Sequence, residues 1–348
     1  MAIPGTANET PSHVPRATAS MVASRAGVSV ATVSLVASGK TDGRVSAETV
    51  ARVQRAISDL NYVVNRVASS LATGSSNFVI LIAPDISNSF FARLIAGVRE
   101  SLGSSYQLLL SVTDSGQMPR AESVRELLAF RPAGLLVDAP SEQLMQSMSI
   151  DGPIVLLDAP GAKGILPAVN LDVVHGAEAL ATHLAERGHR TFSYLDSVTA
   201  TSTFALRRTA FLAKAQECGM RQTEHIRARS TIDTGSAAAE FGKVWPAWQA
   251  AGVTVVVCAT DTHAYGVLQT AHSLGIRVPE QLAVAGFDDL PFSAMSHPSL
   301  TSVELPARKL GRAAASLLVA LIEGRVPEAE LPILPSRLII RDSTGVHN

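Results

Sequence analysis

The sequence has few cysteines and no long apolar run, and each shortage excludes a class of protein. Its two cysteines, Cys218 and Cys258, cannot form a disulfide framework, and neither lies in a CxxC or Cys/His spacing that would hold a metal. The longest apolar segments, 78–83 and 313–322, are well short of the ~18 residues that a membrane-spanning helix needs. We therefore expect a soluble, cytoplasmic protein with no metal and no membrane partner.

The chain also lacks an excess of charge of either sign. Its 29 Lys and Arg residues against 30 Asp and Glu residues give a net charge of -1, which by itself argues against a nucleic-acid partner. The charge is unevenly distributed, however: residues 1–73 hold seven basic and four acidic residues (+3), and residues 74–348 hold 22 and 26 (-4). The near-neutral total conceals a basic head on an acidic body, and a basic head suits contacts with DNA phosphates.

Short catalytic motifs are absent as well. The sequence contains no GxGxxG, GxxxxGKS/T, GxSxG or HExxH, and its nine histidines show no metal-ligand spacing. We therefore expect neither an enzyme nor a bound cofactor.

The 348 residues are enough for two or three domains. Residues 1–17 combine Pro, Gly, Ser and Thr without an apolar period, which predicts a disordered tail. Residues 18–63 have helical patterning, and residues 64–76 indicate two helical turns followed by a linker. From residue 77 to 343, compact apolar runs alternate with helix-length amphipathic stretches, which predicts an α/β body with parallel sheets in two lobes.

The N-terminal helices have the spacing of a helix-turn-helix unit. Gly27 breaks a first helix ending at Ala26 from a second over 29–37, with Ser29 as its N-cap. A third helix is predicted over 46–60. The side chains that would lock the first two helices together are Val22, Ala26, Val28, Val33 and Val36. This arrangement turns the start of the second helix outward, toward a DNA major groove; an ordinary helical hairpin is the alternative.

The segments AGVSVATVSLVASGK (26–40) and RVSAETVARVQRAISDLNYVVNRVASSLATG (44–74) resemble the lactose-repressor (LacI) family of bacterial transcription regulators. The similarity continues in PDISNSFFARL (84–94), RGHR (187–190), RRTAF (207–211), ATDTHAYGVL (259–268) and VAGFDDLPFSAMSHPSLTSV (284–303). The resemblance implies a helix-turn-helix head on a two-lobed body like periplasmic sugar-binding proteins. It further implies a homodimeric repressor of a pseudo-palindromic operator, controlled by a small molecule, expected to be a sugar, between the lobes.

For DNA, the resemblance implies that Val30, Ala31 and Leu35 face the bases. These side chains make no bidentate hydrogen bonds and only pack on thymine methyls, so direct base readout is expected to be weak. Leu35 packing inward against the third helix is an equal alternative. Ser29, Thr32 and Ser34 are expected at phosphates.

Residues 65–73 look like the family's hinge helix, which folds when two subunits meet on DNA. Leu71 matches the apolar wedge of the minor groove, and Asn65 and Arg66 would lie at the adjoining backbone. A buried Leu71 in a plain linker helix is the alternative.

Six acids follow apolar runs of the body and are expected near the carboxyl ends of strands, where ligands bind: Asp85, Asp138, Asp158, Asp196, Asp261 and Asp288. About half of them are expected to cap helices instead. The resemblance places the effector at Phe90, Phe91, Asp138, Asp158, Arg207, Thr260 and Asp288. The alternatives are a surface charge for Arg207 and core packing for Phe91. Two departures, Ala159 after Asp158 where the family often has Arg and Thr260 where it commonly has Asn, leave the sugar unspecified.

A solute-binding protein of the same two-lobed fold is the runner-up function. The helix-turn-helix unit opposes it, as does the lack of an export signal at the N-terminus. No segment for a C-terminal coiled coil follows Ser343, which favours a dimer over a tetramer.

Overall fold

The computed structural model divides into two compact units, residues 1–74 and 75–348. It describes residues 17–345 with gaps at 38, 40, 64–75, 85, 87, 114–120, 141–143, 145–151, 163–165, 200, 224–225 and 326–332. Nearly all of the predicted tail and hinge, including Asn65, Arg66 and Leu71, lies outside the described residues.

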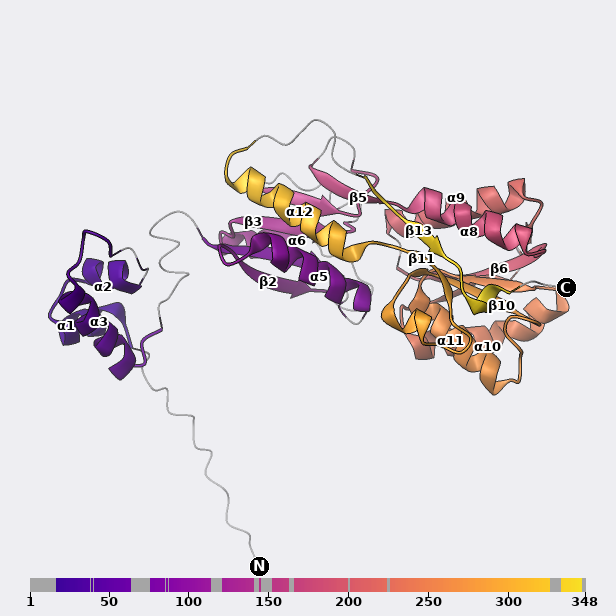
Figure 1. The fold of residues 1–348 in the computed structure, drawn as a ribbon, viewed down its shortest axis with the longest axis horizontal. Coiled ribbons are helices and arrows are strands. Elements are labelled where there is room, and N and C mark those ends of the chain that lie inside the picture. Colours follow the sequence, from indigo (N-terminus) through magenta and orange to yellow (C-terminus); the bar gives the residue numbers. More distant parts are fainter. Residues whose placement is uncertain are drawn as a thin grey trace, which may run out of the picture. The chain divides into compact units, whose positions relative to one another are not determined.

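The N-terminal unit contains three helices, as predicted: α1 (Ala19–Ala26), α2 (Val30–Ala37) and α3 (Ala47–Asp59) (Figure 1). Gly27 ends α1 in the left-handed conformation (φ 64°), which glycine adopts without a steric penalty. Ser29 Oγ accepts a hydrogen bond from Thr32 N at 3.2 Å and so caps α2. The predicted apolar side chains form one small core with Val22, Ala23, Ala26, Val33, Val36, Val53 and Ala56 buried at its centre.

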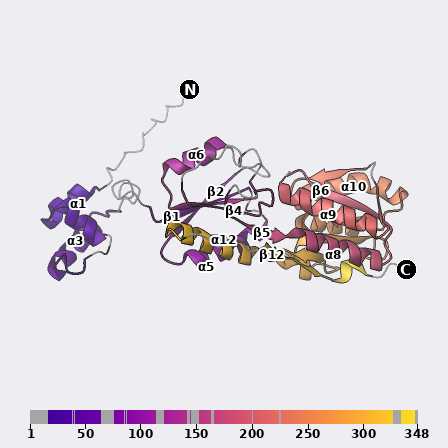
Figure 2. The same ribbon diagram turned by 90° about the horizontal axis from the view of Figure 1, so that it is seen from above.

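The first lobe of the body is a six-stranded sheet in the order β12-β5-β4-β3-β1-β2. Its strands are β1 (Phe78–Ala83), β2 (Gln107–Val112), β3 (Gly134–Asp138), β4 (Ile154–Leu157), β5 (Ala168–Asp172) and β12 (Ile333–Pro335). Helices α5 (Ser89–Leu102) and α12 (Ala307–Ile322) cover one face, and α6 (Ala121–Ala129) covers the other (Figure 2). All its described strand pairs are parallel.

The second lobe is a seven-stranded sheet in the order β13-β11-β10-β9-β6-β7, with β8 also paired to β6. Its strands are β6 (Thr191–Ser197), β7 (Arg221–Gln222), β8 (Ala228–Ser230), β9 (Val255–Cys258), β10 (Ala283–Asp288), β11 (Thr301–Glu304) and β13 (Arg337–Ile339). Helices α8 (Val173–Glu186) and α9 (Ser202–Glu217) lie on one face, with α10 (Thr234–Ala250) and α11 (Asp261–Ser273) on the other (Figure 1). Short 3-10 turns occupy Pro291–Ala294 (η1) and Asp342–Thr344 (η2).

The chain passes between the two lobes three times: from β5 into α8, from β11 into α12, and from β12 into β13. At the third passage, Ser336 Oγ donates to the carbonyl of Asp172, which ties two of the passages together. Because each lobe is built from distant parts of the chain, a change in the angle between the lobes bends all three passages at once.

The prediction of a two-lobed α/β body is therefore confirmed. The apolar runs at 78–83, 107–112, 134–137, 154–157, 192–195, 253–257 and 282–287 all contribute strands. The prediction missed β5, β7, β8, β11, β12 and β13, which are short or carry polar residues. Strand β13 also pairs antiparallel with β11, so the second sheet is parallel except at that edge.

Among the described residues, no single helix is long and apolar enough to cross a membrane; α1 and α2 meet that test only as a pair bent by 102°.

Candidate functional site

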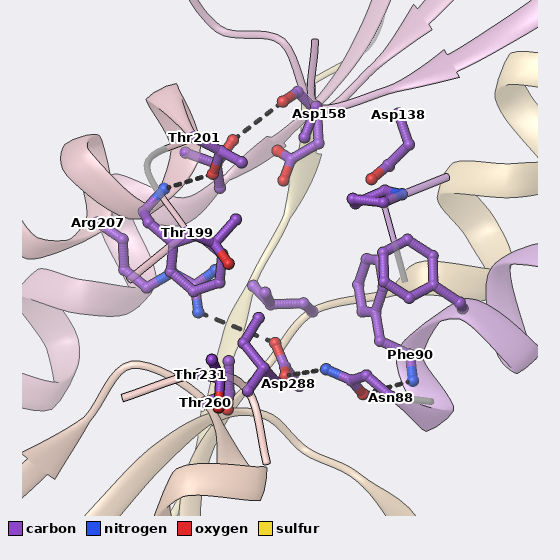
Figure 3. Close-up of a pocket in the computed structure, with 17 residues that line it drawn as sticks. Asn88, Phe90, Asp138, Asp158, Thr199, Thr201, Arg207, Thr231, Thr260 and Asp288 are labelled. Atoms are coloured by element: carbon purple, nitrogen blue, oxygen red, sulfur yellow. Dashed lines mark hydrogen bonds and ion pairs between the residues drawn. The ribbon is translucent and has the colours of Figure 1, made fainter. Parts of the chain in front are cut away.

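A cleft lies between the two lobes of the body, at the carboxyl ends of their strands (Figure 3). Its space not filled by atoms is about 740 Å³, including its opening to solvent. The lining combines charged groups, threonine hydroxyls and aromatic rings from both lobes. All seven residues that the sequence predicted for the effector line this cleft: Phe90, Phe91, Asp138, Asp158, Arg207, Thr260 and Asp288.

The strand ends at the cleft have unusual backbone conformations. Ala139, Asp158 and Asp288 have positive φ angles of 37°, 49° and 106°. Such conformations at non-glycine residues raise the energy of the backbone and concentrate at functional sites. Asp158 and Asp288 adopt these conformations where β4 and β10 end, and both side chains line the cleft.

Arg207 is a buried cleft residue. Its side chain lies on α9 and is only 4% exposed, which rules out the surface-charge alternative. Nη1 donates to the carbonyl of Ala259 at 2.7 Å and lies 3.9 Å from Oδ1 of Asp288. The guanidinium also lies over the rings of Phe204 and Phe287, with its carbon 4.6 and 4.8 Å from their centres. The neighbouring Arg208 is the solvent-facing one, with its side chain 42% exposed beside Asp196.

Three buried acids line this cleft, and two of them, Asp158 and Asp288, are attracted by Arg207. Burial raises the pKa of Asp158 and of Asp288 from 3.8 to about 6, against the attraction of Arg207. Burial raises the pKa of Asp138 well above its ordinary value, and the negative charge of Asp158 raises it further. Carboxyl groups in this state gain most from a ligand that donates hydrogen bonds or positive charge.

Phe90 and Phe91 serve the core and the cleft together. Their rings make an edge-to-face pair with centres 5.5 Å apart, and both belong to the main apolar core of the body. Both also line the cleft, so the core-packing alternative for Phe91 is compatible with contact to a ligand.

Of the five predicted acids that the structure describes, three line the cleft: Asp138, Asp158 and Asp288. Asp196 instead pairs with Arg208 and Arg229 outside it. Asp261 is fully buried and accepts hydrogen bonds from Leu290 N and from Ser293 and Ser302 Oγ. Asp85 lies outside the described residues.

The helices that follow these strands are capped by other side chains. Asn88 caps α5, Thr201 caps α9 and Thr260 caps α11, each accepting a hydrogen bond from a backbone N–H of the first turn. The expectation that about half of the acids would act as caps is therefore wrong for those preceding these helices. All three actual caps line the cleft.

Several cleft residues were missed by the sequence analysis. They include two helix caps, further threonine hydroxyls, apolar groups, and a residue in the passage from β11 into α12. The missed residues are Pro84, Asn88, Ala139, Thr199, Thr201, Thr203, Phe204, Thr231, Ile232 and Leu305. A usable signal for the caps was a Ser, Thr or Asn after a strand and just before a helix, because capping chemistry at such a turn brings the residue to the carboxyl edge of the sheet.

The two lobes also touch directly beside the cleft. Asn88 Nδ2 donates to Asp288 Oδ2 at 3.3 Å, and Thr203 Oγ1 donates to the carbonyl of Asp158 at 3.0 Å. Arg93 Nη1 donates to the carbonyl of Asp289 at 2.7 Å. These bonds hold the lobes in the arrangement seen in the structure.

The head presents the predicted DNA-facing turn to solvent. Ser29, Val30, Ala31 and Ser34 are exposed, and Val30 is 49% exposed despite its apolar side chain. Thr32 and Leu35 are half-buried. Thr32 Oγ1 lies 2.9 Å from Ser29 Oγ, the oxygen that caps α2, so the two hydroxyls are hydrogen-bonded to each other.

The described residues contain no group of three or more His, Cys, Asp or Glu side chains that could hold a metal.

Comparisons with known proteins agree with both parts. A family model for bacterial regulatory proteins of the lacI family matches residues 20–65, and a model for the periplasmic binding protein-like domain matches residues 181–344. The ribose operon repressor of Bacillus subtilis is 31% identical over 333 residues, covering 94% of this chain and 98% of the relative.

Solved structures show the same architecture. The complex of the transcriptional regulator CelR with cellobiose is 28% identical, with a TM-score of 0.67 over 94% of this chain and all of that chain. A lac repressor dimer bound to operator is 23% identical, with a TM-score of 0.77 over 95% of this chain and all of that one, and shares the fold. The chain therefore belongs to the lacI family of bacterial regulatory proteins.

Proposed function

We propose that the protein is a dimeric repressor whose head binds a pseudo-palindromic operator and whose cleft binds a carbohydrate that sets operator affinity. The observation that carries this proposal is the convergence of carboxylates, hydroxyls and rings from both lobes on one cleft. A ligand that contacts both lobes binds one lobe arrangement better than another, and this difference is the free energy that couples the cleft to the head.

We infer a carbohydrate ligand from the chemistry of the side chains that line the cleft. Carboxylates accept hydrogen bonds from sugar hydroxyls, threonine hydroxyls both donate and accept, and phenylalanine rings pack on the apolar face of a sugar. The cleft offers all three kinds of group, with Phe90 on one side and Thr199 and Thr201 on another (Figure 3). The names of the relatives agree, since one is a ribose operon repressor and another is a regulator in complex with cellobiose.

Operator binding rests on the first turn of α2. Val30 and Ala31 meet thymine methyls, and Ser29, Thr32 and Ser34 meet phosphates. Leu71 acts as the minor-groove wedge beside Asn65 and Arg66. Because the base-facing side chains are apolar, much of the affinity comes from phosphate contacts and is expected to fall steeply with salt.

A second copy of this chain is the partner that we propose for the exposed edge of the first lobe. Strand β2 is an edge strand, and its Leu109, Leu110 and Val112 are between 44% and 48% exposed. An uncovered apolar edge strand invites aggregation, so proteins usually cover it. A pseudo-palindromic operator requires two heads, and pairing along β2 would supply the second one.

The alternatives are weaker. A pure solute-binding protein has no use for a helix-turn-helix head, and residues 20–65 match the lacI family model. The relatives found are transcription regulators rather than enzymes. Because its target is operator DNA, we place the protein in the cytoplasm.

The test uses the full-length protein. It is first used to select fragments from a genomic DNA library, and the selected fragments then serve as probes in fluorescence anisotropy at several salt concentrations. In parallel, sugars, sugar phosphates and purines are screened by thermal shift, because a ligand of the folded state raises the transition temperature. A stabilising sugar that changes the anisotropy titration is the expected result. If only a purine stabilises the protein, the proposal of a carbohydrate effector is wrong. If no DNA fragment is enriched, the proposal of a repressor is wrong.

A further inference from the structure

The charges that line the cleft do not balance. Among the described residues that line it, the charged side chains are the carboxyl groups of Asp138, Asp158 and Asp288 and the guanidinium of Arg207. Arg207 lies 3.9 Å from Asp288 and also attracts Asp158. Arg93 attracts Asp288 as well, whereas no cation of the described residues offsets Asp138. Burial without such an offset disfavours the ionised form of a carboxyl group.

Asp138 has the least compensation of the three. It is the last residue of β3 and is 4% exposed, and its Oδ1 has no hydrogen-bond partner among the described residues. Asp288 differs, because Asn88 donates to its Oδ2. A buried carboxylate oxygen without a donor costs free energy until a ligand supplies one. Burial and the neighbouring Asp158 both raise the pKa of Asp138, which is the response of a carboxyl group that lacks a compensating cation.

A second unpartnered group indicates what else the ligand carries. Thr199 is 5% exposed, and its Oγ1 also has no hydrogen-bond partner among the described residues. Figure 3 shows Asp138 and Asp158 at one end of the cavity and Thr199 with Arg207 toward the other. A hydroxyl group on the ligand would satisfy Thr199, whereas Asp138 calls for a donor that also carries positive charge.

We propose that the effector is an amino sugar whose ammonium group lies against Asp138 and Asp158 while its hydroxyls reach the threonines. This inference rests on the proposed carbohydrate response and specifies its chemical class. An ammonium group supplies three donors and one positive charge, so it donates to Oδ1 of Asp138 and stabilises the ionised form of that carboxyl group. A neutral sugar supplies donors but no positive charge, so it does not favour the ionised form of Asp138.

Isothermal titration of the full-length protein tests the proposal. A panel of 2-amino-2-deoxy hexoses is compared with the parent hexoses and with the N-acetylated forms, which keep the bulk at that position and lose the charge. We expect the best amine to bind at least about tenfold more tightly than both neutral partners, equivalent to about 1.4 kcal/mol. Titrations in two buffers of different ionisation enthalpy should also reveal a proton released when the ammonium group ionises Asp138.

The variant Asp138→Asn keeps the shape of the side chain and removes its charge. It should lose the preference for the amine and the proton release, and thermal unfolding verifies that it is folded. Asp196→Asn is the matched control, because Asp196 pairs with Arg208 and Arg229 outside the cleft, and it should keep both properties.

Three outcomes would overturn the inference. If neutral hexoses bind as tightly as amines, or if Asp138→Asn keeps the preference for the amine, the proposed contact of an ammonium group with Asp138 is wrong. The proposal of a carbohydrate-responsive repressor is then unaffected. If no sugar of either set binds while operator binding is intact, the carbohydrate effector itself is wrong, and the inference fails with it.

Discussion

Asn88 and Asp288 join the two lobes across the cleft, with Nδ2 of Asn88 donating to Oδ2 of Asp288 at 3.3 Å. The same Asn88 caps α5, because its Oδ1 accepts a hydrogen bond from Phe90 N at 2.9 Å. One amide side chain therefore starts a helix in the first lobe and binds a cleft carboxylate of the second. Arg93 of α5 adds a second link, since its Nη1 donates to the carbonyl of Asp289, just after β10.

Two substitutions at Asn88 separate these roles. Asn88→Ala should lower the stability of the body by about 1 kcal/mol through loss of the cap. It should also remove the hydrogen bond to Asp288, so that the two lobes separate more readily. Asn88→Ser keeps a capping oxygen but is too short to bind Asp288, so it should restore most of the stability and leave the lobes freer. Urea unfolding measures the first effect, and small-angle scattering of the ligand-free protein measures the second. A scattering curve for Asn88→Ser identical to that of the wild type would contradict the lobe-linking role.

Arg207 and Arg208 should respond in opposite ways to truncation. Arg207→Ala leaves Asp288 buried beside an empty space, and breaking a buried pair in this way costs about 3–5 kcal/mol. Arg208→Ala removes a half-exposed pair with Asp196 and should cost less than about 1 kcal/mol. Urea unfolding of both variants gives the comparison. Adding Asp288→Asn to Arg207→Ala should recover part of the loss, and additive losses would argue against the coupling of the two side chains.

The cleft carboxylates should make the ligand-free protein less stable as pH rises. The pKa of Asp158 and of Asp288 is raised from 3.8 to about 6, so between these values the folded state holds protons that the unfolded chain has lost. The stability that these groups contribute is complete below pH 3.8 and is lost as the pH rises through about 6. Because other carboxylates contribute their own slopes, the measurement is the difference between wild type and Asp158→Asn in urea unfolding from pH 4 to 7. We expect the variant to lose less stability over this range than the wild type, and parallel curves would contradict the shift.

Two helix glycines should respond to alanine with opposite signs. A Cβ at Gly311 would lie 2.1 Å from the carbonyl oxygen of Leu94, so α5 and α12 can cross this closely only without a side chain there. Gly311→Ala should therefore destabilise the body by about 1–3 kcal/mol. A Cβ at Gly242 would meet only Thr270 Cγ2 at 3.6 Å, an ordinary contact. Gly242→Ala should stabilise the protein by up to about 1 kcal/mol through helix propensity. Thermal unfolding of both variants decides whether the signs differ as expected.

The proposed wedge at Leu71 should matter for DNA and not for folding. Leu71→Ser should weaken operator binding about tenfold or more, since a wedge that kinks the duplex is worth on the order of a few kcal/mol. The melting temperature of the body should not change. Leu274→Ser, at an exposed apolar residue of the body, serves as the control. Equal operator affinity for Leu71→Ser and the wild type in a gel shift would remove the wedge from the mechanism.

Local chemistry made much of the fold predictable. Gly27 and Ser29 mark the turn of the head because a left-handed residue and a capping hydroxyl act within one or two residues of their own position. The runs 78–83 and 107–112 are predictable as strands because a fully apolar or apolar-rich stretch of that length must be shielded or paired. By contrast, β11 was missed because its Thr301 and Ser302 are fully buried polar residues, whose partners Arg341, Ser343 and Asp261 lie some 40 residues away.

The residues of the cleft also fall into those that were predictable from the sequence and those that depend on the tertiary structure. The sequence shows that acids stand at or shortly after the ends of the strands of the body, because each lies directly after an apolar run or within four residues of its end. Only the tertiary structure decided that Asp138 and Asp158 face the cleft while Asp196 turns to Arg208 and Arg229. It likewise buried Arg207 and left Arg208 half-exposed, although the two are adjacent on one helix. The direction of a side chain at a strand end and the facing side of a helix depend on how the two lobes close, and that closure is made by contacts between residues far apart in the chain.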